Sequence, residues 1–193
     1  MTDAVLAVRP LYRGWLSLQM LRLRLGDVEC NRAVVEHVSG ATVLAYDPVR
    51  RVAMTVRQTR DAVLYLGGLP FAEAIAGVTE DEAPADTAVR EAYEETGLRL
   101  RHVEPVAHVW MTPSSTTERV HLFLAEYAAA DRVGAGGGAA DEIETIDARE
   151  EPLDALWAEA VSGRVGDAKF FMLLQALRLR RPELFAEIGR AHV

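Results

Sequence analysis

One short segment, REAYEETG at residues 90–97, constrains the fold more than any other part of the sequence. Pro84 suits the first position of a helix, where its missing N–H needs no partner, and Gly97 suits the left-handed residue that ends one. We therefore predict a helix from Pro84 to about Thr96. Three carboxylates at positions i, i+3 and i+4 share one face of it: Glu91, Glu94 and Glu95.

Like charges at this spacing repel each other, so such a face needs either full solvation or a neutralising partner. A hard divalent cation such as Mg²⁺ takes carboxylate oxygens, keeps several of its waters and bridges to phosphate groups. Taken alone, the three acids are more typical of a solvated helix face on a plain interaction domain. The surrounding sequence has to decide between these two interpretations.

The bulk composition excludes several classes of protein. The net charge of −8 disfavours binding to nucleic acid, whereas a small phosphorylated substrate can still be held through a metal ion. The sequence contains no run of eighteen apolar residues, so no membrane-spanning segment is predicted. The first ten residues do not resemble a secretory signal. We therefore expect a cytoplasmic protein without a membrane partner. At 193 residues the chain fits one compact unit, and we expect the single cysteine, Cys30, in its core.

Short β-rich runs with turn residues between them predict strands both before and after the central helix in the sequence. The segment 64–76 is apolar and glycine-punctuated, and we expect one or two short strands there. Two further helices are indicated near the carboxyl end, at 152–161 and 170–179. The predicted fold class is α+β, with strands at 29–38, 41–46, 51–57, 103–111 and 120–127.

Residues 76–98, AGVTEDEAPADTAVREAYEETGL, resemble the signature box of the Nudix hydrolases, and the similarity extends from about residue 32 to residue 179. Two positions depart from that pattern: four residues instead of five separate Gly77 from Glu82, and Ala92 replaces a larger aliphatic side chain. The role of Glu82 therefore stays open. The resemblance implies a Nudix-type α/β/α sandwich with a mixed central sheet over 39–193, preceded by an antiparallel β-sheet region over 1–38.

The resemblance also implies a Mg²⁺ cofactor, with Mn²⁺ able to substitute, and a set of site residues. Arg90 would steady the carboxylates, and a general base would come from the loop after the glycine-rich segment 134–140, with Glu142 favoured over Asp141 and Glu144. By composition alone that segment is a flexible loop or linker, followed by solvated acids. The implied metal ligands are Glu91 and Glu95, assisted by Glu94 and the backbone carbonyl of Ala76.

Within the superfamily, the chain is most similar to the branch that hydrolyses ADP-ribose, GDP-mannose and related nucleotide sugars to a nucleoside monophosphate and a sugar phosphate. The glycine-rich segment and Asp167-Ala168-Lys169 favour the GDP-mannose type. The resemblance further implies a homodimer formed through the N-terminal strands. A nucleotide-sugar sensor without turnover remains the alternative. None of the five histidines shows a ligand-like spacing in the sequence. The implied substrate-binding residues are Arg57, Gln58, Arg60, Pro113 and Glu118.

Overall fold

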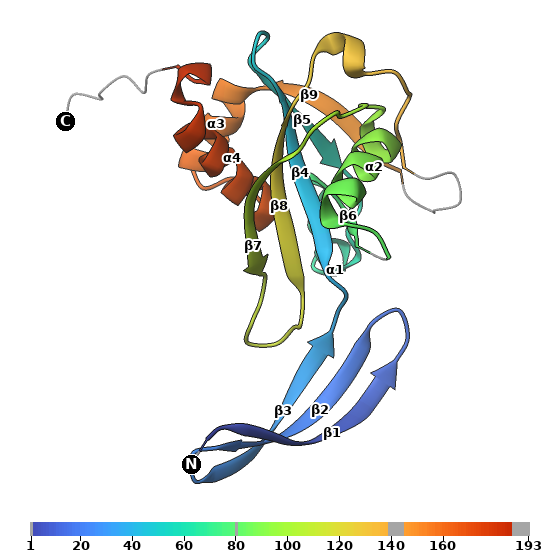
Figure 1. Cartoon of the computed structure of the whole chain (residues 1–193), viewed down its shortest axis with the longest axis vertical. Helices are drawn as coiled ribbons and strands as arrows, with labels where there is room; N and C mark the ends of the chain where they lie inside the picture. The colour runs from blue at the N-terminus through green and yellow to red at the C-terminus, as the bar shows by residue number, and fades with distance from the viewer. Residues whose placement is uncertain (1, 80, 139–144, 187–193) are drawn as a thin grey trace, which may run out of the picture.

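The computed structural model describes residues 2–79, 81–138 and 145–186, and it contains two separate sheets. A small three-stranded sheet extends from one end of a larger body built on a six-stranded sheet with helices on both faces (Figure 1). Among the described residues, no helix is long and apolar enough to cross a membrane. The mixed sheet and its helices confirm the predicted α+β class, with an additional antiparallel sheet at the N-terminus.

The small sheet consists of β1 (Ala4–Arg13), β2 (Ser17–Leu25) and β3 (Val28–Glu36), paired antiparallel in that order. Gly26 adopts φ +60° in the two-residue turn between β2 and β3, a conformation that favours glycine. Cys30 lies on β3, is only partly buried and is not part of the core, so the core prediction for it was wrong. The reason is that no second layer from the described residues covers this sheet.

The large sheet has the order β7-β8-β4-β5-β9, and β6 pairs with the first half of β4. β4 and β8 run parallel from Gly40 opposite Val120 to Tyr46 opposite Glu126, whereas the other neighbours are antiparallel. The strands are β4 (Gly40–Asp47), β5 (Val52–Arg57), β6 (Ile75–Val78), β7 (Glu104–Trp110), β8 (Arg119–Glu126) and β9 (Asp147–Pro152).

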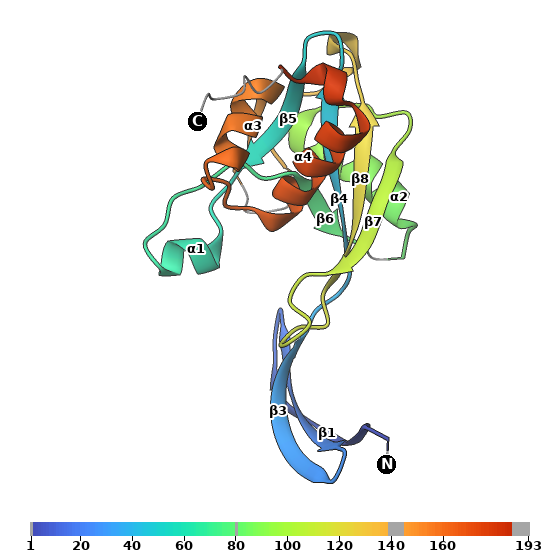
Figure 2. The same ribbon diagram turned by 90° about the vertical axis from the view of Figure 1, so that its left-hand side faces the viewer.

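Helices cover both faces of this sheet, as Figures 1 and 2 show, and each face has its own apolar core. Alternate residues of β4 serve the two cores: Val43 packs on the side of α2 (Pro84–Thr96), and Leu44 packs on the side of α4 (Ala168–Arg180). α3 (Leu153–Val161) lies beside α4. This arrangement is the α/β/α sandwich that the sequence predicts.

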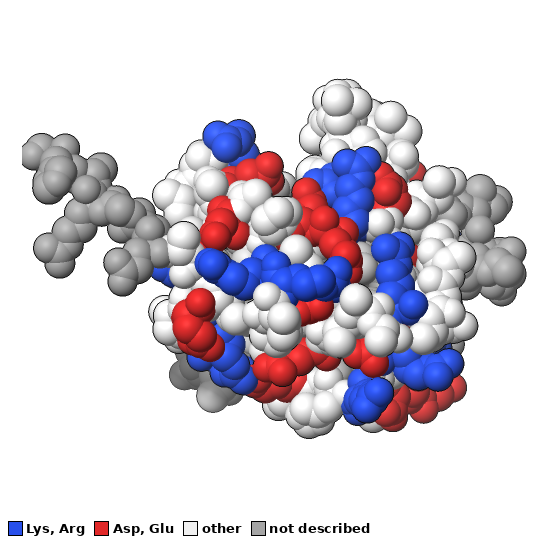
Figure 3. All heavy atoms as spheres, turned by 90° about the horizontal axis from the view of Figure 1, so that it is seen from above, with Lys and Arg blue, Asp and Glu red and all other residues white. Residues whose placement is uncertain are grey.

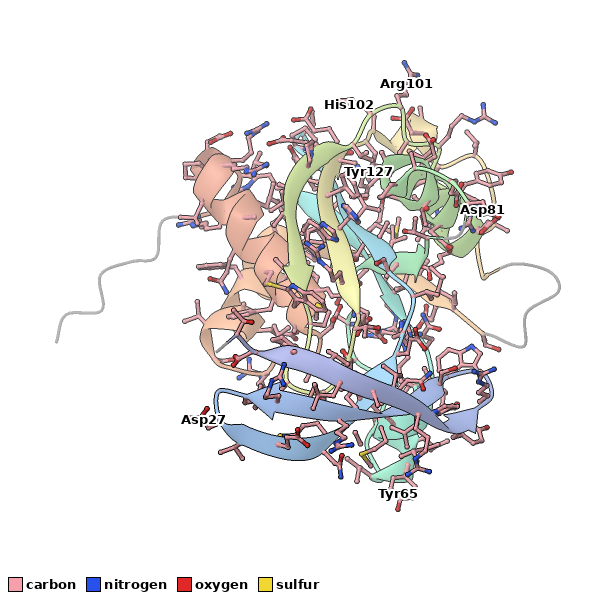
Figure 4. The ribbon with its side chains drawn as sticks, turned by 60° about the horizontal axis from the view of Figure 1, so that its bottom comes forward. Asp27, Tyr65, Asp81, Arg101, His102 and Tyr127 are labelled. Atoms are coloured by element: carbon pink, nitrogen blue, oxygen red, sulfur yellow. The ribbon has the colours of Figure 1, made fainter. Side chains whose placement is uncertain are left out.

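The segment after β5 differs from the expectation for 64–76. It begins with a short helix, α1 (Asp61–Tyr65), and only β6 forms the expected strand. Tyr65, labelled in Figure 4, is 88% exposed. The apolar run 64–76, which resembled strands, therefore lies largely on the surface. Two single 3₁₀ turns, at Ala129–Asp131 and Pro182–Leu184, complete the described elements.

Ion pairs cover the end of the body that is remote from the small sheet. Figure 3 looks onto this end and shows acidic and basic side chains interleaved. Arg50 makes a bidentate pair with Glu150 at 2.7 Å, and Arg180 pairs with Glu104 at 2.6 Å. Burial and a hydrogen bond to Glu150 raise the pKa of Tyr127 above its usual value. The basic side chains here are neutralised within the chain.

The small sheet is tied to the body through the loop between β7 and β8. Val35 on β3 donates to the Ser115 carbonyl at 2.8 Å and accepts from the Thr117 N–H at 3.0 Å. The Thr117 hydroxyl accepts from the His37 N–H at 2.8 Å and donates to its carbonyl at 3.0 Å. These bonds bring the turn between β1 and β2 to the same end of the body as β6 and the start of α2.

Candidate active site

Helix α2 holds the three predicted carboxylates at one end of the body. It begins at Pro84 and ends at Gly97, whose φ of +73° is the predicted left-handed cap. The helix packs its small apolar residues on the sheet, and this leaves its acidic face along a cavity. Glu95 is 4% exposed, and Glu91 and Glu94 are progressively more accessible.

Arg90 lies among these carboxylates. Its guanidinium contacts Glu91 at 2.8 Å and Glu94 at 2.7 Å, and it donates to Glu82 at 3.0 Å. Burial by itself would lower the pKa of Arg90, but the hydrogen bond to Glu82 and the charges of the two helical acids raise it above its usual value. Glu82, whose role the sequence left open, is therefore a partner of Arg90 in this structure.

Strand β6 closes the cavity opposite the helix, and Gly77 explains how close the two elements come. A Cβ atom added at Gly77 would lie 1.8 Å from Oε1 of Glu91, so only glycine leaves room for that carboxylate. Ala76, the neighbouring residue, pairs with Thr42 on β4 and also lines the cavity. The main chain of β6 and the acids of α2 thus face the same space.

The cavity has a volume of about 1290 Å³ and receives residues from both sheets. Asp81 lies on its wall next to the start of α2 and is labelled in Figure 4. Gly138 also lines it, because the glycine-rich segment passes over the end of the helix. Other lining residues that the sequence analysis did not single out come from the small sheet and its connections: Trp15, Leu16, Ser17, Glu36, His37 and Thr117.

Trp15 is the most conspicuous of these additional residues. It lies between β1 and β2, is 89% exposed, and makes an edge-to-face contact with His37 at 6.0 Å between ring centroids. A large exposed aromatic ring at the mouth of a cavity is available for stacking on a flat or apolar ligand surface. The sequence signal that could have revealed Trp15 is its position directly after Gly14, in a turn between two runs that alternate apolar and polar residues.

The donor chemistry of the cavity suits a hard divalent cation. Carboxylate and backbone carbonyl oxygens are the ligands that Mg²⁺ prefers. Within residues 2–79, 81–138 and 145–186, no three carboxylate or imidazole groups stand together as a ready metal cluster. Arg90 instead pairs with Glu91 and Glu94, so a cation that binds Glu91 would take the place of its contact with Arg90. The residue types and their common face on the cavity fit the ion.

The predicted substrate-binding residues do not all reach the cavity. Gln58 is buried on its wall, and Arg60 lines it as well. Arg57 lies on the opposite face of β5, where it makes two 3.0 Å hydrogen bonds to Glu151. Arg57 is the last residue of β5 and Gln58 follows it directly, and successive residues of an extended chain point to opposite sides, so of these two residues it is Gln58 that lines the cavity.

The remaining predicted residues have separate locations. Glu118 lines a smaller adjoining cavity, and Pro113 is exposed in the loop that holds β3. Asp141, Glu142 and Glu144 lie outside the described residues. Away from the site, His108 and His121 stack at 3.6 Å across β7 and β8, a pairing that the sequence did not reveal, and burial lowers the pKa of both.

The glycine-rich segment is anchored on α2. Gly137 donates to the Glu95 carbonyl at 2.9 Å, and Gly138 donates to the Glu94 carbonyl at 3.0 Å. A Cβ atom added at Gly136 would lie 2.6 Å from the carbonyl oxygen of Glu95, and φ is positive at all three glycines. The segment therefore packs against the helix end that carries the buried carboxylate, and it leads directly to residues 139–144.

Comparison with known proteins agrees with this geometry. The NUDIX domain matches residues 36–174. The chain is 37% identical over 156 residues to a GDP-mannose pyrophosphatase of Cronobacter sakazakii, a match that covers 79% of this chain and 80% of the relative. It is 35% identical over 165 residues to the GDP-mannose pyrophosphatase of Klebsiella pneumoniae subsp. pneumoniae, covering 84% and 82% of the two chains. The corresponding protein of Enterobacter sp. is 35% identical over 151 residues, covering 77% and 78%.

Proposed function

Because the chain belongs to the NUDIX family and is a hydrolase of that family, we propose that it cleaves the diphosphate of GDP-mannose to GMP and mannose 1-phosphate. The carboxylate face of α2, held by Arg90 against Gly77 in a cavity of about 1290 Å³, is the observation that carries this proposal. The names of the relatives favour GDP-mannose over ADP-ribose, the other substrate that the sequence leaves open.

Glu91 and Glu95 would hold Mg²⁺, with Glu94 and the carbonyl of Ala76 as further ligands. The ion, when bound, neutralises the diphosphate and lowers the pKa of a coordinated water. Arg90 keeps the carboxylates on one side of the cavity by charge-assisted hydrogen bonds. Arg60 lines the cavity wall, where a guanidinium suits phosphate oxygens.

The general base in this proposal is Glu142, with Asp141 and Glu144 as the other candidates. Its support is the anchoring of Gly137 and Gly138 on the carbonyls of α2, because Asp141 follows only three residues after a glycine that lines the cavity. A loop fixed at this point by a rigid helix can deliver an acid to the substrate. This anchoring favours a catalytic role for the glycine-rich segment and the acids after it over the role of a plain linker.

The small sheet supports a homodimer. A three-stranded sheet needs its apolar side chains covered to be stable, yet Val5, Val8, Tyr12 and Val28 are all more than half exposed. A second copy of the chain would cover them, with residues 1–38 as the dimer-forming part and 39–193 as the hydrolase domain. We expect this dimer in the cytoplasm.

Substrate specificity is tested by incubating the purified protein with Mg²⁺ and GDP-mannose, ADP-ribose, UDP-glucose or GTP, and identifying the products by ³¹P NMR and chromatography. The expected result is GMP and mannose 1-phosphate, in equal amounts, from GDP-mannose, and no product after chelation of the metal. Tight binding of GDP-mannose without product would favour the sensor instead. Preferential cleavage of ADP-ribose would replace the proposed substrate.

A further inference from the structure

A separate cavity of about 400 Å³, here called the remote cavity, lies at the end of the body that is remote from the small sheet. Its floor consists of buried residues near the ends of two strands, Tyr46 of β4 and Leu124 and Ala125 of β8. Because β4 and β8 run parallel, their carboxyl ends open onto the same crevice, a common position for ligands in open sheets covered by helices. None of its lining residues lines the catalytic cavity beside α2.

The rim of the remote cavity is built into the fold. Arg99, Arg101 and His102 come from the connection between α2 and β7, and the last two are labelled in Figure 4. The Arg99 N–H donates to the Asp131 carbonyl at 2.9 Å, which holds the turn containing Asp131 against this connection. Arg181, directly after α4, lines the opposite side. Backbone contacts therefore position the side chains around the cavity.

Two basic side chains of this rim are exceptions to the ion pairing at this end of the body. Within the described part of the chain, neither the Arg99 guanidinium nor the His102 imidazole pairs with another side chain. Arg101 reaches Asp131 only at 3.6 Å, and its side chain is 87% exposed. A guanidinium suits the oxygens of a phosphate group, which it binds by charge-assisted hydrogen bonds. The rim therefore has donors available for a phosphate.

Two carboxylates of the same cavity can accept further hydrogen bonds. Glu126 accepts from the Tyr46 hydroxyl at 3.0 Å through one oxygen, and Asp131 accepts from the Ala128 N–H at 2.8 Å through Oδ2. Burial and the bond to Glu126 raise the pKa of Tyr46 above its usual value, so its hydroxyl stays a donor. Each carboxylate offers more acceptor positions than these bonds use. Such acids repel a bare phosphate, but they match the hydroxyl groups of a sugar.

We propose that the remote cavity binds a sugar phosphate, with the phosphate on Arg99 and His102 and the sugar hydroxyls on Glu126 and Asp131. Its volume of about 400 Å³ is much smaller than the 1290 Å³ of the catalytic cavity, so it suits a fragment of a nucleotide sugar rather than the whole molecule. A sugar phosphate is one product of the reaction proposed above. The inference goes beyond that function, because binding at this cavity can be measured without turnover.

Titration calorimetry on the metal-free protein tests this assignment. Mannose 1-phosphate should bind at one site per chain, at least roughly tenfold more tightly than inorganic phosphate or mannose, because each of these keeps only one of the two sets of contacts. Arg99→Met should weaken the binding at least roughly tenfold, the scale for a lost hydrogen bond to a charged group. Arg164→Met removes an exposed arginine that lines none of the three cavities, and should leave the affinity unchanged.

Proton NMR of the histidine rings locates the ligand on the unaltered protein and covers the case in which Arg99→Met fails to fold. His102 lines the remote cavity, whereas His37 lines the catalytic cavity. Mannose 1-phosphate should move the ring resonances of His102, which are assigned with His102→Gln. The ring resonances of His37, assigned in the same way with His37→Gln, should stay in place.

The outcomes decide between this site and the alternatives. Undiminished affinity in a folded Arg99→Met protein, or movement of the His37 resonances without those of His102, would overturn the inference. Equal affinity for inorganic phosphate, or tighter binding of GMP, would show that the cavity does not select a sugar phosphate and would overturn it as well. Failure of the protein to hydrolyse any nucleotide sugar would remove the proposed function and leave a measured sugar-phosphate site standing.

Discussion

Replacement of Glu95 by Gln is expected to reduce kcat for nucleotide-sugar hydrolysis at least roughly a hundredfold, the scale for losing a catalytic electrostatic group. Glu95 is the most buried of the three helical acids, and it lines the cavity. Glutamine keeps its size but carries no charge with which to hold a cation. Steady-state kinetics at saturating Mg²⁺ measure the effect, and the thermal unfolding midpoint shows whether the fold is intact.

Asp86→Asn is the matched control for this variant. Asp86 is exposed in the first turn of the same helix and does not line the cavity. Its replacement removes one negative charge from α2, as Glu95→Gln does, and should leave kcat within about twofold, the scale of an exposed charge. Wild-type turnover by Glu95→Gln would rule out the assignment of α2 as the metal-binding helix.

The second large effect is expected from Gly77→Ala. The added Cβ would occupy the position of the Glu91 carboxylate, at 1.8 Å from Oε1, so the glutamate must move out of its 2.8 Å contact with Arg90. Displacing a ligand through its supporting contact commonly costs about ten- to a hundredfold in activity or metal affinity. We therefore expect a fall of that size in kcat/KM, with a higher Mg²⁺ concentration needed for half-maximal activity.

Gly163→Asn provides the comparison for this glycine. Gly163 has φ +75° with nothing near its Cβ position, and asparagine tolerates that backbone conformation. Its kinetics should match those of the unaltered protein. If Gly77→Ala had an unchanged Mg²⁺ requirement and unchanged kcat/KM, the close approach of β6 to Glu91 would have no functional meaning.

Local signals in the sequence predicted the helix that carries the chemistry. Pro84 and Gly97 define its two ends through backbone geometry alone, and the spacing of Glu91 and Glu95 places both on one face. These signals depend only on residues a few positions apart, so they can be interpreted without any knowledge of the tertiary structure. The same holds for α3 and α4, whose apolar periodicity was visible before the fold was known.

Features that depend on register between distant strands could not be predicted. The parallel pairing of β4 with β8 joins residues 80 positions apart, and β9 is too charged to resemble a strand. Arg57 and Gln58 were assigned together because residues 56–60 resemble a strand end of the nucleotide-sugar branch, but at the end of β5 Arg57 pairs with Glu151 while Gln58 lines the cavity. His108 and His121 meet for a related reason, since the alignment of β7 with β8 sets them opposite each other.

Composition was also a poor guide to the glycine-rich segment. Gly136, Gly137 and Gly138 suggest a flexible linker, yet their positive φ values and hydrogen bonds fit the end of α2 closely. Small residues serve here for close backbone approach. Cys30 is the opposite case: an apolar alternating pattern suggested the core, but β3 belongs to a sheet that no other layer of the described chain covers.

Binding of Mn²⁺, measured by electron paramagnetic resonance as the loss of signal from the free ion, tests the central claim most directly, because Mn²⁺ takes the same oxygen ligands as Mg²⁺. The unaltered chain should bind the ion, Mg²⁺ should displace it, and the double variant Glu91→Gln, Glu95→Gln should bind it at least roughly tenfold more weakly. Asp86→Asn should bind as the unaltered chain does. Equal Mn²⁺ affinity in the double variant and the unaltered chain would show that the acids of α2 are a solvated helix face and not a metal site.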